Sequence, residues 1–174
     1  MDANEKEESP IDWESWEPEI RATLLFIKVG EDVLLIEKQR GIGAGKVNGP
    51  GGKIDPGETP YQCALRETQE ELCINATGVR KMGELFFAMS DIPDIHCHVF
   101  MGTGFEGTPQ ATPEAIPMWS KISEIPFGRM WEDDRYWLGE MLSGKTFRGR
   151  FTFAGEAIQW SQMEFGMSWE QEGE

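Results

Sequence analysis

The amino-acid sequence predicts an α+β domain in which a mixed sheet packs against two helices. Two observations support this class. Apolar segments rich in branched and aromatic residues are separated by glycine and proline turns, which is typical of strands. Two further segments carry apolar residues at helical spacing. The chain has 174 residues, 39% of them hydrophobic, so it is long enough to bury a core as one domain.

The beginning of the chain predicts an arm, a hairpin and a glycine-rich loop. Residues 1–19 are acidic and include two prolines, so we expect a solvated arm before a domain over residues 20–170, with Trp13 or Trp16 docked on that domain. The segments RATLLFIKV and VLLIEKQ flank the turn GED and predict a β-hairpin. The next segment, RGIGAGKVNGPGGK, has six glycines, which favours a loop or an interrupted strand.

The first helix is predicted after this loop. Thr59 is a typical N-cap, Pro60 fits the first turn, and residues 61–72 contain neither glycine nor proline. At about 100° per residue, the helix has one apolar stripe and one acidic face. The stripe consists of Tyr61, Ala64, Leu65, Thr68 and Leu72, and the acidic face of Glu67, Glu70 and Glu71.

The rest of the chain predicts further strands and a second helix. VRKMGELFFAM and DIHCHVFMGTGF read as strands joined by a turn around Pro93, and PMWSKI and TFRGRFTF as two more. WEDDRYWLGEMLSG predicts a helix that ends at Gly144. Its expected apolar stripe is Tyr136, Leu138, Met141 and Leu142. The last strand, QMEFGMSW, is expected to place on one face Met163, Phe165, Met167 and Trp169.

The acidic helix face has two interpretations. One is a solvated surface, the ordinary role of charged residues on a helix. However, three carboxylates within one turn repel one another, and only Arg66 lies near enough to offset them. A bound cation would remove this repulsion, and hard oxygen ligands suit Mg²⁺ or Mn²⁺, which also bind phosphates. We therefore predict a site for Mg²⁺, or for Mn²⁺ in its place.

Charge and cysteine content limit the partners and the compartment. The net charge of -15 disfavours nucleic acid polymers and anionic membranes as partners. The three cysteines form no CxxC pair, which favours free thiols in a reducing compartment. The acidic start does not resemble a secretion signal, and there is no run of about 18 apolar residues. We expect a cytoplasmic protein that acts as a monomer.

The segment from Gly52 to Ile74 resembles the signature of the Nudix hydrolases, in which a glycine loop leads into a metal-binding helix. Gly52, Glu58 and the run RETQEELCI occur at the spacing of that signature. Thr68 stands where an aliphatic residue is usual, and we expect its hydroxyl to bond to the preceding turn. Cys73 replaces the glycine that usually ends the helix, and it would be strained at a positive φ. The resemblance implies an α/β/α sandwich.

The resemblance also implies a role for each charged residue of the helix. The metal would be bound by Gly52 through its backbone, with Glu67, Glu70 and Glu71. Arg66 would orient a glutamate, and Glu58 would pair with Arg66 and brace the loop. These side chains form the expected catalytic set.

From about Thr23 to Phe153 the chain is similar to the MutT-related oxidised purine nucleoside triphosphatases. The segments KQRGIGAGKVNGPGGK, TPEAIPMW, ISEIPFGRMWEDDRYW and KTFRGRFTF occur in the order found in that subgroup. The implied substrate-binding residues are Asn48, Trp131, Asp133, Asp134, Thr23 and Lys38. Glu114 would lie near the metal.

The adjacent acids Asp133 and Asp134 have two interpretations. In a poorly solvated pocket, one carboxyl can keep its proton and donate a hydrogen bond to the base while the other accepts. Alternatively, the two acids only stabilise a helix N-terminus through its dipole. By the resemblance, Ile42, Val47 and Pro50 replace aromatic residues, and each replacement removes a surface that would shape the base pocket.

His96 and His98 form a weaker candidate. They alternate on a predicted strand, so both point the same way, but the sequence shows no nearby third ligand. We expect them to have a structural or surface role.

We therefore expect Mg²⁺-dependent hydrolysis of oxidised purine nucleoside triphosphates, such as 8-oxo-dGTP, to the monophosphate and pyrophosphate. This reaction sanitises the nucleotide pool and prevents DNA damage. The alternatives are a Nudix enzyme for unmodified triphosphates, ADP-ribose or dinucleoside polyphosphates, or a module that binds nucleotides without catalysis. The complete set of Arg66 and the three glutamates favours an enzyme.

Overall fold

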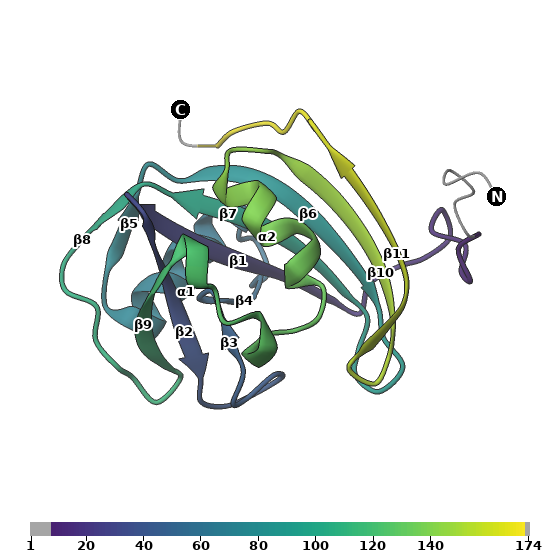
Figure 1. Ribbon diagram of the computed structural model, residues 1–174, viewed down its shortest axis with the longest axis horizontal. Helices are drawn as coiled ribbons and strands as arrows, with labels where there is room; N and C mark the ends of the chain where they lie inside the picture. The colour runs from purple at the N-terminus through teal and green to yellow at the C-terminus, as the bar shows by residue number, and fades with distance from the viewer. Residues whose placement is uncertain (1–7, 173–174) are drawn as a thin grey trace.

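A mixed sheet of nine strands forms the centre of the protein (Figure 1). The strands are β1 (Ile20–Val29), β2 (Asp32–Lys38), β3 (Val47–Asn48), β4 (Gly51–Lys53), β6 (Arg80–Ala88), β7 (Ile95–Gly102), β9 (Ala115–Lys121), β10 (Phe147–Ala154) and β11 (Ala157–Phe165). Their order is β11-β10-β6-β7-β1-β2-β3, with β4 also paired to β1 and β9 to β2. β1 runs parallel to β7 and β10 parallel to β6, whereas the other pairs are antiparallel. The computed structural model describes residues 8–172.

Two helices cover opposite faces of this sheet, α1 (Pro60–Leu72) and α2 (Asp134–Leu142). Leu25 and Ile27 of β1 lie in the core cluster that contains α1 residues, whereas Phe26 lies in the cluster that contains Trp137 of α2. This division follows from the alternation of side chains along a strand. The sheet is therefore the middle layer of an α/β/α sandwich, as the resemblance implied.

β1 pairs with two different strands on the same edge. Residues Ala22–Leu24 pair with β4, and Ile27–Val29 pair with β2 after the hairpin turn. The sheet therefore divides along β1, and the glycine loop that contains β4 is brought to the side of α1. Figure 1 shows the long curved strands β6, β10 and β11 on one side of the molecule, and β2, β3 and β9 on the other.

The start and the end of α1 match the predictions from the sequence. Thr59 is the N-cap: its side chain accepts a hydrogen bond from the Gln62 N–H, and the Gln62 side chain accepts one from the Thr59 N–H. This reciprocal capping box satisfies two N–H groups that the helix leaves free. After Leu72 the chain turns at Cys73, which adopts the left-handed conformation with φ 61 and ψ 30. A cysteine therefore occupies a position that favours glycine.

Part of the predicted apolar stripe of α2 is wrong. Tyr136 is 45% exposed, whereas Trp137 is fully buried. The buried residues of α2 are Asp134, Trp137, Leu138, Met141 and Leu142. Their spacing of three and four residues is that of one helical face, and Tyr136 falls outside it.

The predicted extent of the last strand is also wrong. β11 ends at Phe165 because Gly166 has a positive φ of 78, so Met167 and Trp169 do not continue its alternation. Trp169 instead donates a hydrogen bond from Nε1 to the Met82 carbonyl. The sequence analysis also missed a small second sheet of β5 (Asn75–Thr77) and β8 (Gly104–Glu106).

The predicted arm lies only in part within the described residues, because residues 1–7 are outside them. Both Trp13 and Trp16 pack on the domain, as described below, rather than one of them. Within residues 8–172, no helix has the length and apolar character needed to cross a membrane.

Candidate active site

A cavity of about 710 Å³ lies where β1, β2, the glycine loop and α1 meet. Eleven of the residues predicted for the site line it. They are Thr23, Lys38, Asn48, Gly52, Glu67, Glu70, Glu71, Glu114, Trp131, Asp133 and Asp134. Arg66 and Glu58, the other two, do not line the cavity. The acidic helix face and the adjacent pair of acids, far apart in the sequence, therefore belong to one cavity.

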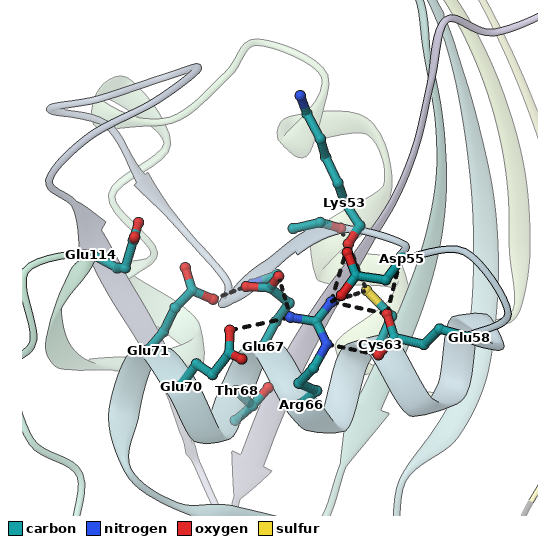
Figure 2. A network of polar contacts seen from close by, with 12 residues as sticks. Lys53, Asp55, Glu58, Cys63, Arg66, Glu67, Thr68, Glu70, Glu71 and Glu114 are labelled. Carbon is teal, nitrogen blue, oxygen red and sulfur yellow. Dashed lines mark hydrogen bonds and ion pairs between the residues drawn. The ribbon is translucent and has the colours of Figure 1, made fainter.

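Arg66 connects the carboxylates of α1 to one another (Figure 2). Its Nε and Nη2 donate to Glu58 at 2.7 and 2.9 Å, and its Nη1 donates to Glu67 at 2.9 Å and to Glu70 at 3.1 Å. The hydrogen bond from Arg66 lowers the pKa of Glu58 to about 2. Glu58 therefore stays ionised and holds the guanidinium, which orients Glu67 and Glu70.

Glu71 is the most buried of the three glutamates, with 4% of its surface exposed. Its Oε2 accepts a hydrogen bond from the Gly51 N–H at 2.8 Å. Burial raises the pKa of Glu71 to about 8, and burial also raises the pKa of Glu67. Both carboxylates thus lie where a negative charge is poorly solvated.

The glycine loop approaches α1 so closely that a side chain would not fit. A Cβ at Gly52 would lie 2.6 to 2.8 Å from the carboxylate atoms of Glu67. The backbone of Gly52 and the carboxylates of α1 therefore lie beside one cavity wall. These hard oxygen donors fit a divalent cation such as Mg²⁺ or Mn²⁺, which would also stabilise the buried negative charge.

Two cationic residues lie near these carboxylates. Burial lowers the pKa of Lys38, although its ammonium is attracted by Glu71, Glu114 and Glu67. Glu114 accepts a hydrogen bond from Arg40 Nε at 2.7 Å, so its carboxylate is held at the cavity rim. The cavity thus offers both acidic and basic groups to a ligand that carries metal-bound phosphates.

The other end of the cavity contains the adjacent pair of acids. Asp133 and Asp134 are 3% and 2% exposed. Trp137 donates from Nε1 to Asp133 Oδ2 at 2.8 Å, while Oδ2 of Asp134 has no hydrogen-bond partner among the described residues. Burial raises the pKa of both carboxyls, and repulsion by Asp133 raises that of Asp134 further. Their contact with the cavity supports ligand binding over a purely helix-stabilising role.

Trp131 forms the aromatic wall near these acids. Its ring makes an edge contact with Phe153, with centroids 6.1 Å apart, and Lys46 Nζ lies 5.0 Å from its centroid. Gly43 lies against the Trp131 ring, because a Cβ at Gly43 would be 2.9 Å from Nε1. The glycine-rich loop therefore packs on the residue predicted to stack on a base.

The replaced aromatic positions have different surroundings. Ile42 lines the cavity, so its replacement does change the wall. Val47 and Pro50 are buried, and neither lines the cavity, so neither offers a surface to a base. Val47 instead points into the core cluster on the α2 side, because β3 turns this side chain towards α2. Thr68 donates to the Ala64 carbonyl at 2.8 Å, as expected.

An apolar part of the cavity was missed in the sequence. It is lined by Phe87, Met89, Ile92, Ile95 and Phe153. These residues read as ordinary strand or turn residues, and no local pattern tells which apolar residue lies at an open end of a sheet. The alternation of Phe151 and Phe153 could have predicted that Phe153 faces the same side of β10 as Phe151, since both lie on one face of that strand.

The pair His96 and His98 does have a third neighbour, Glu84 of β6. His96 Nε2 lies 2.5 Å from Glu84 Oε1. Lys81 Nζ lies 3.1 Å from both Glu84 Oε2 and His98 Nδ1. An ammonium group therefore already occupies the position of a cation in this cluster, in agreement with the expected structural role.

Comparisons with known proteins agree with this geometry. The NUDIX domain pattern matches residues 18–141. The chain is 40% identical over 139 residues to the oxidized purine nucleoside triphosphate hydrolase of Danio rerio, covering 78% of this chain and 88% of that protein. It is 38% identical over 132 residues to the Mus musculus protein of the same name, covering 75% and 85%.

Solved structures show the same fold. The mutator MutT protein from Bacillus halodurans superposes with a TM-score of 0.75 at 23% identity, over 83% of this chain and 97% of that one. The MutT protein from Methanosarcina mazei superposes with a TM-score of 0.62, also at 23% identity, over 73% and 94%. The fold is therefore shared well beyond the range of close sequence similarity.

Proposed function

The chain belongs to the Nudix family, and from this premise we propose that it hydrolyses oxidised purine nucleoside triphosphates, such as 8-oxo-dGTP, to the monophosphate and pyrophosphate with Mg²⁺. One observation carries the proposal. A single cavity joins the carboxylates of α1 to Trp131 and the buried pair Asp133 and Asp134. A triphosphate and a purine can occupy its two ends together. The names of the Danio rerio and Mus musculus relatives support the same substrate class.

The phosphate end is assigned to hydrolysis. Glu67, Glu70 and Glu71, with the backbone of Gly52, would hold divalent metal, which neutralises charge on the phosphates and activates water when bound. The water oxygen forms a bond to one phosphorus of the α–β bridge and releases its proton to solvent, and the P–O bond of the bridge breaks, which separates the monophosphate from pyrophosphate. Arg66 fixes two of the glutamates, so its role is positioning.

The other end is assigned to the base. Two buried carboxyls that cannot both ionise present one O–H donor and one set of acceptor oxygens. Trp131 provides the flat apolar surface on which a purine stacks. Asn48, Thr23 and Lys38 line the same cavity, and we assign them to contacts with the bound nucleotide. We propose that this arrangement selects the purine edge.

An assay of pyrophosphate release tests the proposal. Ordinary, 8-oxo, 2-oxo and methylated purine triphosphates are compared with and without Mg²⁺, for the wild type and Glu71→Gln. Glu106→Gln, an exposed site on β8 away from the cavity, is the matched control. We expect oxidised substrates to be preferred, and only Glu71→Gln to lose turnover, by at least about 100-fold. Turnover of none of the substrates, or equal turnover by Glu71→Gln, would contradict an enzymatic function.

One observation favours a second candidate, an enzyme for unmodified purine triphosphates. Ile42 lines the cavity where the resemblance implies an aromatic residue, so one stacking surface for an oxidised base is absent. The same assay separates the two candidates. Preference for unmodified triphosphates would remove the damaged-base assignment and leave the reaction unchanged.

We also propose that residues 20–170 form the catalytic domain and that the protein is a cytoplasmic monomer. All three cysteines are free thiols, with Cys63 and Cys97 buried, which suits a reducing compartment. Size-exclusion chromatography with light scattering tests the monomer, and cell fractionation tests the location.

A further inference from the structure

The turn between β6 and β7 forms one wall of the substrate cavity. Met89 and Ile92 of this turn line the cavity, and Ile95 lines it at the start of β7. The position of these side chains therefore limits the space that is available to a base. The contacts that hold the β6–β7 turn in place therefore determine the shape of this wall.

Asp94 connects the turn to the N-terminal segment Glu8–Glu19, which we call the docked arm. Its Oδ1 accepts a hydrogen bond from the Met89 N–H at 2.8 Å. Its Oδ2 accepts one from Trp16 Nε1 at 2.9 Å. The Asp94 carbonyl also accepts from the N–H groups of Glu19 and Ile20, both at 3.0 Å. One residue thus bonds both to the cavity wall and to the docked arm.

Aromatic contacts hold the docked arm against the sheet. The Trp16 ring makes an edge contact with Phe86, with centroids 5.9 Å apart, and Trp13 stacks on Trp160 of β11 at 6.0 Å. Trp13 and Trp16 also contact each other at 5.3 Å. Phe86 precedes Phe87, which lines the cavity, so the Trp16 ring packs on the sheet face opposite to Phe87. Figure 1 shows this segment beside β10 and β11.

A second hollow, of about 500 Å³, lies between the docked arm and the same turn. Pro10, Ile11 and Trp16 of the arm line it, together with Met89 and Phe153. Met89 and Phe153 also line the substrate cavity. Two side chains therefore separate the arm from the space assigned to the base.

We propose that Trp16, through Asp94, is a positioning residue that fixes the Met89–Asp94 turn and so sets which purine bases the cavity accepts. The inference rests on the proposed function and adds a specificity determinant outside the cavity. Trp16 touches no substrate. It acts because a carboxylate that accepts two N–H bonds from different segments is held in one orientation, and Met89 is held with it.

The two tryptophans of the docked arm provide a matched pair of variants. Trp16→Phe keeps an aromatic ring against Phe86 and removes the Nε1–H that bonds to Asp94. Trp13→Phe makes the same chemical change, but Trp13 Nε1 is buried without a hydrogen-bond partner in the part of the chain that the structure describes. A general effect of removing an indole would appear in both variants, whereas an effect through Asp94 would appear only in Trp16→Phe.

Steady-state kinetics on the preferred and the next-best purine triphosphate is the first measurement. Because a hydrogen bond to a charged group is lost, we expect Trp16→Phe to raise KM for the preferred substrate by about tenfold and to narrow the discrimination between bases, with kcat changed less than about twofold. Trp13→Phe should keep the wild-type KM and discrimination. Equal effects of the two variants, or wild-type values for Trp16→Phe, would overturn the inference.

Hydrogen exchange of the full-length protein is the second measurement and does not depend on turnover. We expect faster exchange over residues 86–95 in Trp16→Phe than in the wild type or Trp13→Phe, because the Met89 amide loses its fixed acceptor. Unchanged exchange in this segment would overturn the inference even if the kinetics changed. A wild type without triphosphatase activity would overturn the proposed function and, with it, the specificity role. An active wild type with an unaffected Trp16→Phe would overturn the specificity role alone.

Discussion

The backbone of Gly51 lies directly against that of Thr23 on β1. A Cβ at residue 51 would be 1.9 Å from the Thr23 carbonyl oxygen, a separation that no side chain tolerates. The same glycine donates its N–H to Glu71. Close contact between β4 and β1 is therefore a condition for placing an N–H group opposite the most buried carboxylate of α1.

Gly51→Ala should reduce both stability and activity. The clash involves backbone atoms of two strands, so it cannot be relieved by a side-chain rotation, and we expect a loss of more than about 2 kcal/mol in the free energy of unfolding. Gly139→Ala is the control: it lies in α2 with nothing within 4 Å of the added Cβ, so it should gain about 0.5–1 kcal/mol. Urea denaturation measures both. Equal stability of the two variants would contradict the close packing of β4 on β1.

Arg66→Lys should lower activity although it keeps the charge. One ammonium group cannot replace a guanidinium that bonds to Glu58, Glu67 and Glu70 at once. We expect kcat/KM to fall by about 10- to 100-fold. The affinity for metal should also fall, so a metal titration should show a higher concentration for half-maximal activity. Arg129→Lys, an exposed residue paired with Glu37, should leave kcat/KM unchanged. A fully active Arg66→Lys variant would show that activity does not need the hydrogen bonds of the guanidinium to several glutamates at once.

Asp133→Asn should change the preference among bases more than the affinity for metal. An amide cannot exchange a proton with Asp134, so the pair loses one of its hydrogen-bonding patterns. The ratio of kcat/KM values for two purine triphosphates should change by about tenfold and lose its pH dependence, while the metal concentration for half-maximal activity stays constant. Asp32→Asn, at the exposed first residue of β2, is the control. A variant with weakened metal binding and unchanged base preference would argue against this role.

The network around His98 should make stability depend on pH. Burial, together with the charge of Lys81, lowers the pKa of His98 to about 4 from 6.5. Between these values the unfolded chain binds more protons than the folded one. The stability associated with a neutral, buried His98 is therefore fully present above pH 6.5 and is lost as the pH falls towards 4. Thermal unfolding between pH 7 and 5 should show a smaller decrease in Tm for His98→Gln than for the wild type. The same decrease in Tm for both proteins would show that His98 does not contribute to the pH dependence of stability.

Local features of the chain predicted the helix α1 and both of its ends well. The capping box needs only Thr59 and Gln62, which are three residues apart, and the positive φ at Cys73 follows from its position after the last turn. The contact of Glu58 with Arg66 spans eight residues, and it was available only through the resemblance.

Features that depend on distant segments were not predicted. The direction of Val47 depends on the pairing of β3 with β2. The docking of one of the two tryptophans was expected, but the partner of Trp16, Asp94, lies 78 positions away and was not. The end of β11 depends on the conformation of one residue, Gly166, in a segment whose alternation continues beyond it. Periodicity predicts on which face of a helix or strand a residue lies, but it does not predict which other segment of the chain that face contacts.

The parallel insertion of β10 beside β6 has a consequence for synthesis on the ribosome. The Phe147 ring lies over Gly83, where an added Cβ would be only 2.3 Å away, and Phe151 is fully buried in the same core. A nascent chain that has emerged only to the end of α2 therefore has an unpaired edge on β6 and an open core on the α2 side. Since strands that are distant in sequence pair slowly, the domain completes its core only after β10 has left the exit tunnel. Until then, the edge of β6 that β10 will cover stays without its hydrogen-bond partners.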